Sequence, residues 1–149
     1  MKIAIASDHA GYPLKEKLIK HLRSLGYEIS DLGTDSPDVP VDYPDFAIKA
    51  AMEILTDRAE RAIVVCGSGV GACVVANKIK GIRAGLCHDT YSAHQGVEHD
   101  DINVLCLGGR IIGECLAFEI AASFASAKFS GEERHLRRLK KIYSLEKGT

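Results

Sequence analysis

The sequence predicts an α/β protein with a three-layer, Rossmann-like (flavodoxin-like) architecture, in which helices cover both faces of a five-stranded parallel sheet. Two observations carry this expectation: short apolar runs alternate with longer helical patterns, and the apolar runs show little polar alternation. The 149 residues match the usual size of one domain, so we expect a single domain over residues 1–149. Hydrophobic residues make up 46% and charged residues 26%, which excludes a disordered chain.

The expected strands are rich in Ile, Val and Leu, as in strands that are buried on both faces. They cover residues 2–7, 28–32, 61–66, 83–87 and 103–107. The first helix is expected over residues 13–25, where leucines recur every three or four residues and Gly26 ends the pattern. The second is expected over 43–55, with Pro44 in its first turn. The others are expected over 70–78, 90–98, 111–127 and about 132–145, the last being an extra C-terminal helix.

Five strands in a chain of this length suit the strand order 2-1-3-4-5 with right-handed crossovers. In that order the connections leave strands 1 and 3 in opposite directions, and ligands bind at the carboxyl ends of the strands there. Two loops would therefore meet: residues 7–11 (Ser-Asp-His-Ala-Gly) and residues 66–71 (Cys-Gly-Ser-Gly-Val-Gly). These are also the most chemically unusual loops in the chain, so we expect the site there.

Three glycines, Gly67, Gly69 and Gly71, alternate between a strand and a helix. Glycine lets backbone N–H groups approach a ligand closely, so this loop suits a phosphate or a developing oxyanion, although a tight turn without ligand remains the alternative. A Walker A loop is excluded because Ala72-Cys73 follows Gly71. The loop matches the dinucleotide fingerprint only loosely, and a Cys-x5-Arg phosphatase loop would need arginine where Ala72 stands.

Cys66 ends the third strand and faces the start of a helix, a placement that favours the thiolate. A thiolate there could attack an electrophile or remove a proton from carbon. The other four cysteines are interpreted as small buried hydrophobes. An odd cysteine count without a recognisable signal peptide or membrane span favours a reducing, cytoplasmic compartment.

The charge of the chain and the placement of its histidines indicate which kind of ligand the protein binds. The net charge of −1 gives no global field for nucleic acid. Residues 128–147 nevertheless hold seven Lys/Arg and three Asp/Glu, a local net of +4, with Arg134 and Arg138 on one helix face where they could clamp a phosphate. His99 lies among carboxylates and can act as acid or base near neutral pH. We expect no metal site, because His94 and His99 are five residues apart and share no helix face.

Together these motifs resemble the family of ribose-5-phosphate isomerase B and galactose-6-phosphate isomerase over nearly the whole chain. The resemblance rests on segments 7–11, 42–44 (Asp-Tyr-Pro), 66–71, 76–78 (Ala-Asn-Lys), 81–84 (Gly-Ile-Arg-Ala), His99 before 103–105 (Asn-Val-Leu), 108–110 (Gly-Gly-Arg), and Arg134-His135 with Arg138. It implies an aldose–ketose isomerase that needs neither metal nor cofactor. Family members are homodimers or larger assemblies, with the active site at the subunit interface.

The resemblance also implies roles for individual residues. Cys66 would be the base that moves a proton between C1 and C2 of the open sugar, assisted by the hydroxyl of Ser68. Asp8 and His99 would open the sugar ring, with His99 contributed by the partner subunit. The amides of Gly67, Gly69, Val70 and Gly71 would hold the enediolate, and Tyr43 would line the sugar pocket. His9, Arg134 and Arg138 would bind the phosphate, with help from Arg110.

This sequence departs from the family pattern at Asp100, where asparagine is common, and before Arg134, where Gly-Gly is common. Asp100 would lie near enough to the sugar to alter hydroxyl recognition, which leaves the sugar's identity open. The leading hypothesis is isomerisation of D-ribose 5-phosphate to D-ribulose 5-phosphate. The alternatives are the same chemistry on allose 6-phosphate, galactose 6-phosphate or a tetrose phosphate, and a non-catalytic phosphosugar-binding subunit.

Overall fold

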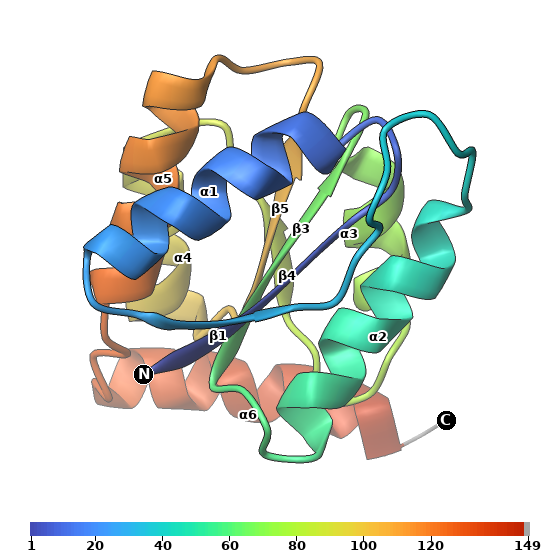
Figure 1. Ribbon diagram of the computed structural model, residues 1–149. Helices are drawn as coiled ribbons and strands as arrows, with labels where there is room; N and C mark the ends of the chain where they lie inside the picture. Colours follow the sequence, from blue (N-terminus) through green and yellow to red (C-terminus); the bar gives the residue numbers. More distant parts are fainter. Residues whose placement is uncertain (148–149) are drawn as a thin grey trace.

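Five parallel strands form one sheet in a computed structural model that describes residues 1–147 (Figure 1). The strands lie within one residue of their predicted bounds. They are β1 (Lys2–Ser7), β2 (Glu28–Asp31), β3 (Arg61–Cys66), β4 (Ala84–Leu86) and β5 (Val104–Gly108). Among them, β1, β3 and β5 are runs of mainly buried residues. The α/β sheet with helices on both faces is therefore confirmed.

The predicted strand order was wrong at one edge. The sheet runs β2-β1-β3-β5-β4, so the last two strands are exchanged relative to the expected 2-1-3-4-5. The physical reason is burial: every residue of β5 is buried, and this strand pairs with β3 on one side and β4 on the other. β4 has only three residues, includes Gly85, and is partly exposed, which suits an edge strand. The connections still leave β1 and β3 in opposite directions, so the predicted site location is unaffected.

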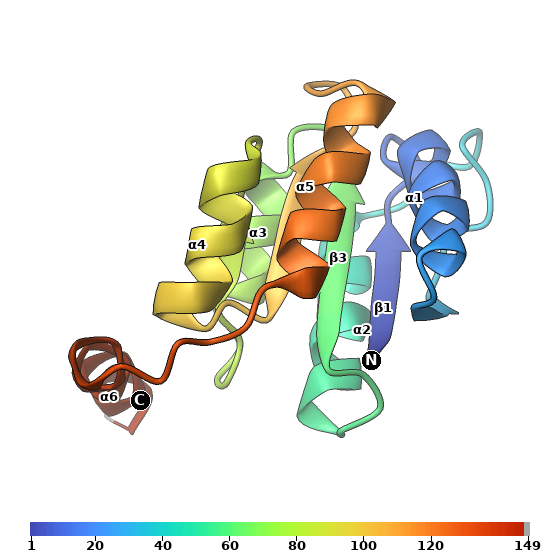
Figure 2. The ribbon, with the colours of Figure 1, turned by 90° about the vertical axis from the view of Figure 1, so that its left-hand side faces the viewer.

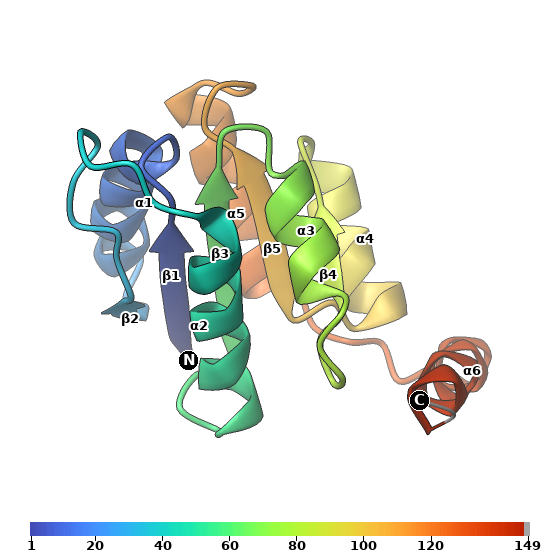
Figure 3. The same cartoon turned by 90° about the vertical axis from the view of Figure 1, so that its right-hand side faces the viewer.

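Helices cover both faces of the sheet, as Figures 1, 2 and 3 show from three sides. One face carries α1 (Tyr12–Ser24), α4 (Thr90–Asp100) and α5 (Glu114–Ser126), and the other carries α2 (Tyr43–Leu55) and α3 (Val70–Ala76). Each face has its own core. Leu18, Ile63 and Phe124 are fully buried in the first core, and Val64 and Cys106 are fully buried in the second.

The extra C-terminal helix α6 (Glu133–Lys147) lies apart from these layers, beyond the end of the sheet where the strands begin (Figures 2 and 3). It contacts α4, and it buries His135 and Leu139, which are four residues apart and share one helix face. The rest of the helix is largely exposed. Within residues 1–147, no helix has the length and apolar character needed to cross a membrane.

Candidate active site

The loops after β1 and β3 meet at the carboxyl end of the sheet, as predicted. The backbone N–H of Asp8 donates to the carbonyl of Val65 (3.2 Å), and the Asp8 carboxylate accepts the N–H of Gly11 (2.9 Å). A Cβ atom at Gly11 would lie 2.2 Å from the Val65 carbonyl oxygen, so only glycine allows this close approach. The Asp8 side chain is thereby fixed beside the end of β3, and the residue is only 7% exposed.

The glycine loop wraps around the Cys66 thiol. The N–H of Gly69 donates to Cys66 Sγ (3.1 Å), and Cys66 is only 3% exposed. Gly69 has a φ of +79° and is the N-cap residue of α3. A Cβ atom there would lie 2.8 Å from the Leu107 carbonyl carbon. The conformation of this loop therefore depends on glycine at position 69.

A cavity of about 330 Å³ opens where these two loops meet. Tyr43, at the start of α2, closes one side of it: a Cβ atom at Gly71 would lie 2.6 Å from the tyrosine ring. Arg110 follows β5 and brings its guanidinium against Gly67. The cavity is lined by Asp8, Tyr43, Cys66, Gly67, Ser68, Gly71, Arg110 and Ile111. One carboxylate, one thiol, two hydroxyls and one guanidinium thus share a single small space.

Two predicted residues of this region, His9, which follows Asp8, and Ser68, which lines the cavity, accept hydrogen bonds from nearby backbone N–H groups. His9 is half-buried, and its Nδ1 accepts the backbone N–H of Val41 (3.1 Å). A neutral His9 ring therefore carries its proton on Nε2, where it can donate to an anion. Ser68 is exposed, and its hydroxyl oxygen accepts the N–H of Val70 (3.3 Å). Both side chains are accessible to a ligand.

A second group of predicted residues lies at the opposite end of the sheet. His99 and Asp100 end α4, whereas Arg134 and Arg138 are exposed on α6. The chain enters α4 beyond the carboxyl ends of the strands, so the end of α4 returns to the edge where they begin. A six-residue strand such as β3 spans about 17 Å between these edges. Neither His99 nor the two arginines line the cavity, so one chain does not bring the two groups together.

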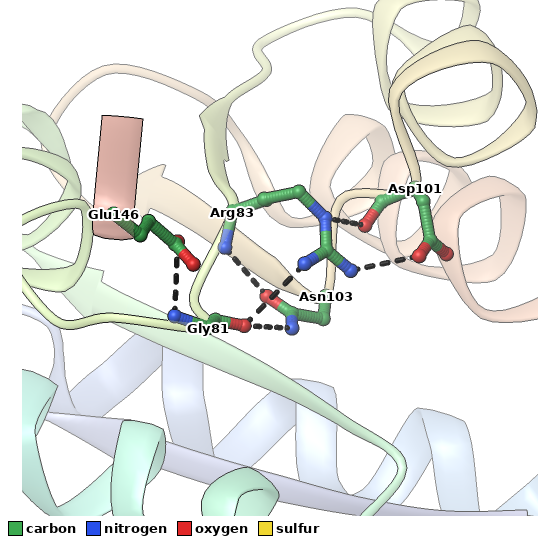
Figure 4. Close-up of polar contacts among 5 residues, drawn as sticks. All are labelled: Gly81, Arg83, Asp101, Asn103 and Glu146. Atoms are coloured by element: carbon green, nitrogen blue, oxygen red, sulfur yellow. Dashed lines mark hydrogen bonds and ion pairs between the residues drawn. The ribbon is translucent and has the colours of Figure 1, made fainter. Parts of the chain in front are cut away.

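A polar network centred on Arg83 holds the end of α4 in place (Figure 4). Arg83 Nε donates to the carbonyl of Asp101 (2.7 Å), and its guanidinium pairs with the Asp101 carboxylate (2.8 Å). Asn103 accepts the N–H of Arg83 (2.8 Å) and donates to the Gly81 carbonyl (3.0 Å). The N–H of Gly81 donates to Glu146 on α6 (3.0 Å). This network therefore links the turn after His99 to the C-terminal helix.

Sequence reasoning assigned no role to His135, which is buried and stacks on His99 with ring centroids 4.1 Å apart. Its four-residue spacing from Leu139 was the available sign that it faces inward. The interpretation of the other four cysteines as small buried hydrophobes was wrong for two of them, since Cys73 is half-buried and Cys115 is exposed. A hydrogen bond with Cys106 lowers the pKa of Cys73 to about 7. By contrast, burial raises the pKa of Cys87 to about 11.

Comparison with known proteins identifies what the chain resembles. The model of the Ribose/Galactose Isomerase family matches residues 3–142. A D-erythrulose-4-phosphate isomerase from Pectobacterium atrosepticum is 40% identical over 131 residues, which cover 88% of this chain and 86% of that protein.

Two solved structures are similar over nearly their full lengths. Ribose-5-phosphate isomerase B from Clostridium thermocellum is 44% identical, with a TM-score of 0.95 and coverage of 99% of both chains. Ribose-5-phosphate isomerase B from Mycoplasma genitalium, solved with bound ribulose 5-phosphate, is 40% identical with a TM-score of 0.93, covering 99% of this chain and 97% of that one.

Proposed function

This chain belongs to the ribose/galactose isomerase family, and we propose that it interconverts D-ribose 5-phosphate and D-ribulose 5-phosphate through an enediolate. The observation that carries this proposal is the cavity in which Cys66, the glycine loop and Asp8 converge. Aldose–ketose isomerisation requires a base beside a carbon acid and donors for the oxyanion that develops. The buried thiol and the loop amides supply these two functions side by side.

Cys66 is the proposed base. As a thiolate it removes the C2 proton of the open aldose, and the electron pair moves through C1–C2 to leave negative charge on the carbonyl oxygen. The backbone N–H groups from Gly67 to Gly71 hold this enediolate. The Cys66 thiol then returns the proton to C1, while the Ser68 hydroxyl assists proton movement between the two oxygens. Cys66 Sγ already accepts the Gly69 N–H (3.1 Å), so the glycine loop holds the sulfur in place beside the loop amides.

Ribose 5-phosphate is a furanose in solution and must open first. Asp8 and His99 are the proposed pair: one takes the proton of the anomeric hydroxyl, and the other protonates the ring oxygen as the C1–O4 bond breaks. Asp8 lies in the cavity, whereas His99 lies at the far edge of the sheet. The pair can therefore act only if His99 comes from a second copy of the chain.

The phosphate group is assigned to His9, Arg110, Arg134 and Arg138. His9 offers Nε2–H because Nδ1 accepts the N–H of Val41, and Arg110 lines the cavity of the same chain. Arg134 and Arg138 share one face of α6 and lie at the same end of the molecule as His99. A homodimer whose active site lies at the subunit interface brings both sets to one substrate, so two complete sites form from two small chains.

The size of the substrate is the second question, because the similar Pectobacterium protein is a D-erythrulose-4-phosphate isomerase. We propose a pentose phosphate, and kcat/KM measured over a panel of aldose phosphates tests this directly. The panel contains ribose 5-phosphate, allose 6-phosphate, galactose 6-phosphate and erythrose 4-phosphate. We expect ribose 5-phosphate to exceed the others by tenfold or more, about 1.4 kcal/mol in transition-state binding. A higher value for any other sugar, or binding of all four without turnover, would contradict the proposal.

A further inference from the structure

The His99 ring is held on three sides. Gln95 Nε2 lies 2.8 Å from His99 Nδ1, and a Glu98 carboxylate oxygen lies 3.6 Å from Nε2, beyond hydrogen-bonding distance. The third contact covers the face of the ring: His135 of α6 stacks on it, with centroids 4.1 Å apart and an interplanar angle of 27°. Of these three contacts, the stacking is the one that comes from outside α4, and it covers a face of the His99 imidazole.

His135 is an unusual residue for this position. It is 1% exposed and lies one turn before the buried Leu139, where an apolar side chain would be ordinary. Its Nδ1 makes one short hydrogen bond with the Ser130 hydroxyl (2.6 Å). Its Nε2 is buried without a hydrogen-bond partner among residues 1–147. A buried polar atom without a partner reduces stability, so packing alone does not account for a histidine here.

We propose that His135 is a positioning residue whose ring face holds the His99 imidazole in the orientation needed for sugar ring opening. This inference rests on the function proposed above. In this proposal His99 acts on the substrate, whereas His135 acts only through its contact with His99. The contribution of His135 is the flat face of its ring rather than a proton.

The electrostatic surroundings of His135 agree with a role that involves no proton transfer. Burial lowers the pKa of His135, and the nearby His99 and Arg134 lower it further, so the His135 ring is neutral near pH 7. A neutral ring can stack on His99 in both protonation states without like-charge repulsion. The charged groups around the pair are Glu98 from α4, Glu132 from the preceding loop, and Arg134 and Arg138 from α6.

The two chemical steps can be measured separately. Ribose 5-phosphate closes its ring through the C4 hydroxyl, so its turnover includes ring opening. Ribulose 5-phosphate has its C5 oxygen esterified and remains open, because closing a five-membered ring from C2 would need that oxygen. Exchange of its C1 hydrogen with deuterium from solvent therefore requires only enediolate formation by the Cys66 base. The ratio of the two rates isolates ring opening.

The experiment compares two matched variants of the full-length protein. His135→Asn keeps a polar group near Ser130 but removes the ring, whereas His135→Phe keeps a flat ring and removes both nitrogens. For His135→Asn we expect kcat with ribose 5-phosphate to fall about 10- to 100-fold, the range that a misplaced catalytic group produces. KM and the C1 exchange rate, followed by proton NMR in deuterium oxide, should stay within about twofold of wild type. His135→Phe should recover kcat to within about threefold of wild type.

A second stacked histidine provides the control. His21 of α1 lies against Phe118 with ring centroids 4.3 Å apart and is not among the proposed site residues. His21→Asn should change neither rate. The inference is wrong if His135→Phe is as slow as His135→Asn, if both reactions fall together, or if neither falls. Failure of the proposed function has a different result, since wild-type protein would then not turn over ribose 5-phosphate.

Discussion

Replacing Gly69 by alanine tests how tightly the glycine loop is held around Cys66. The residue has a φ of +79°, which costs about 1–2 kcal/mol for an L-residue. The new Cβ would also lie 2.8 Å from the Leu107 carbonyl carbon and 3.0 Å from the Gly108 nitrogen. Because these are backbone atoms that cannot rotate away, overpacking adds about 1–3 kcal/mol. We expect Gly69→Ala to lower the free energy of unfolding by about 3 kcal/mol.

Gly26→Ala is the matched control. Gly26 has a φ of +88°, yet a Cβ atom there would meet no heavy atom within 4 Å. Gly26→Ala should lower the free energy of unfolding only by the cost of the positive φ, about 1 kcal/mol. Urea unfolding at one fixed protein concentration measures both variants. The reasoning fails if the two variants differ by less than about 0.5 kcal/mol. It also fails if Gly69→Ala keeps the wild-type kcat, since the Gly69 N–H would then not be held against Cys66 by this geometry.

Three further outcomes are expected. Cys66→Ala should abolish isomerisation while inorganic phosphate still binds in calorimetry; wild-type kcat would refute the cysteine base. Arg138→Ala should raise KM for ribose 5-phosphate at least tenfold. Arg137→Ala is the control, because Arg137 lies off the helix face that Arg134 and Arg138 share, and it should change KM little. Equal effects of the two variants on KM would refute the role of Arg138 in phosphate binding. Because the pKa of Cys73 is about 7, its alkylation by iodoacetamide, followed by peptide mapping, should rise with pH through a midpoint near 7; a midpoint near 9 would contradict the Cys106 hydrogen bond.

The strands and the two loops of the cavity could be predicted from local sequence patterns. A short apolar run that ends at Ser7-Asp8 or Cys66-Gly67 indicates a buried strand and the loop after it without information on distant contacts. The order of β4 and β5 depends on which strand pairs with β3, and no local pattern in their similar apolar runs reports that pairing. The fully apolar β5 and the glycine in β4 were the available signs.

The second group of site residues illustrates the same limit. Periodicity places Arg134 and Arg138 on one face of α6, but only the fold shows that this helix lies at the opposite end of the sheet from the cavity. The burial of His135 likewise follows from the packing of α6 against α4, and its four-residue spacing from Leu139 was the available local sign of it.

The account requires an active site completed by a second copy of the chain, and mixed dimers test this most directly. Cys66→Ala and His99→Asn chains, carrying different affinity tags, are coexpressed, and the mixed dimer is purified through both tags. It should hold one complete site in two and show about half of wild-type activity, although each parent is inactive. A mixed dimer of Cys66→Ala and Asp8→Asn, whose changes lie on the same side of the site, should stay inactive. A Cys66→Ala/His99→Asn dimer without activity would contradict the shared site.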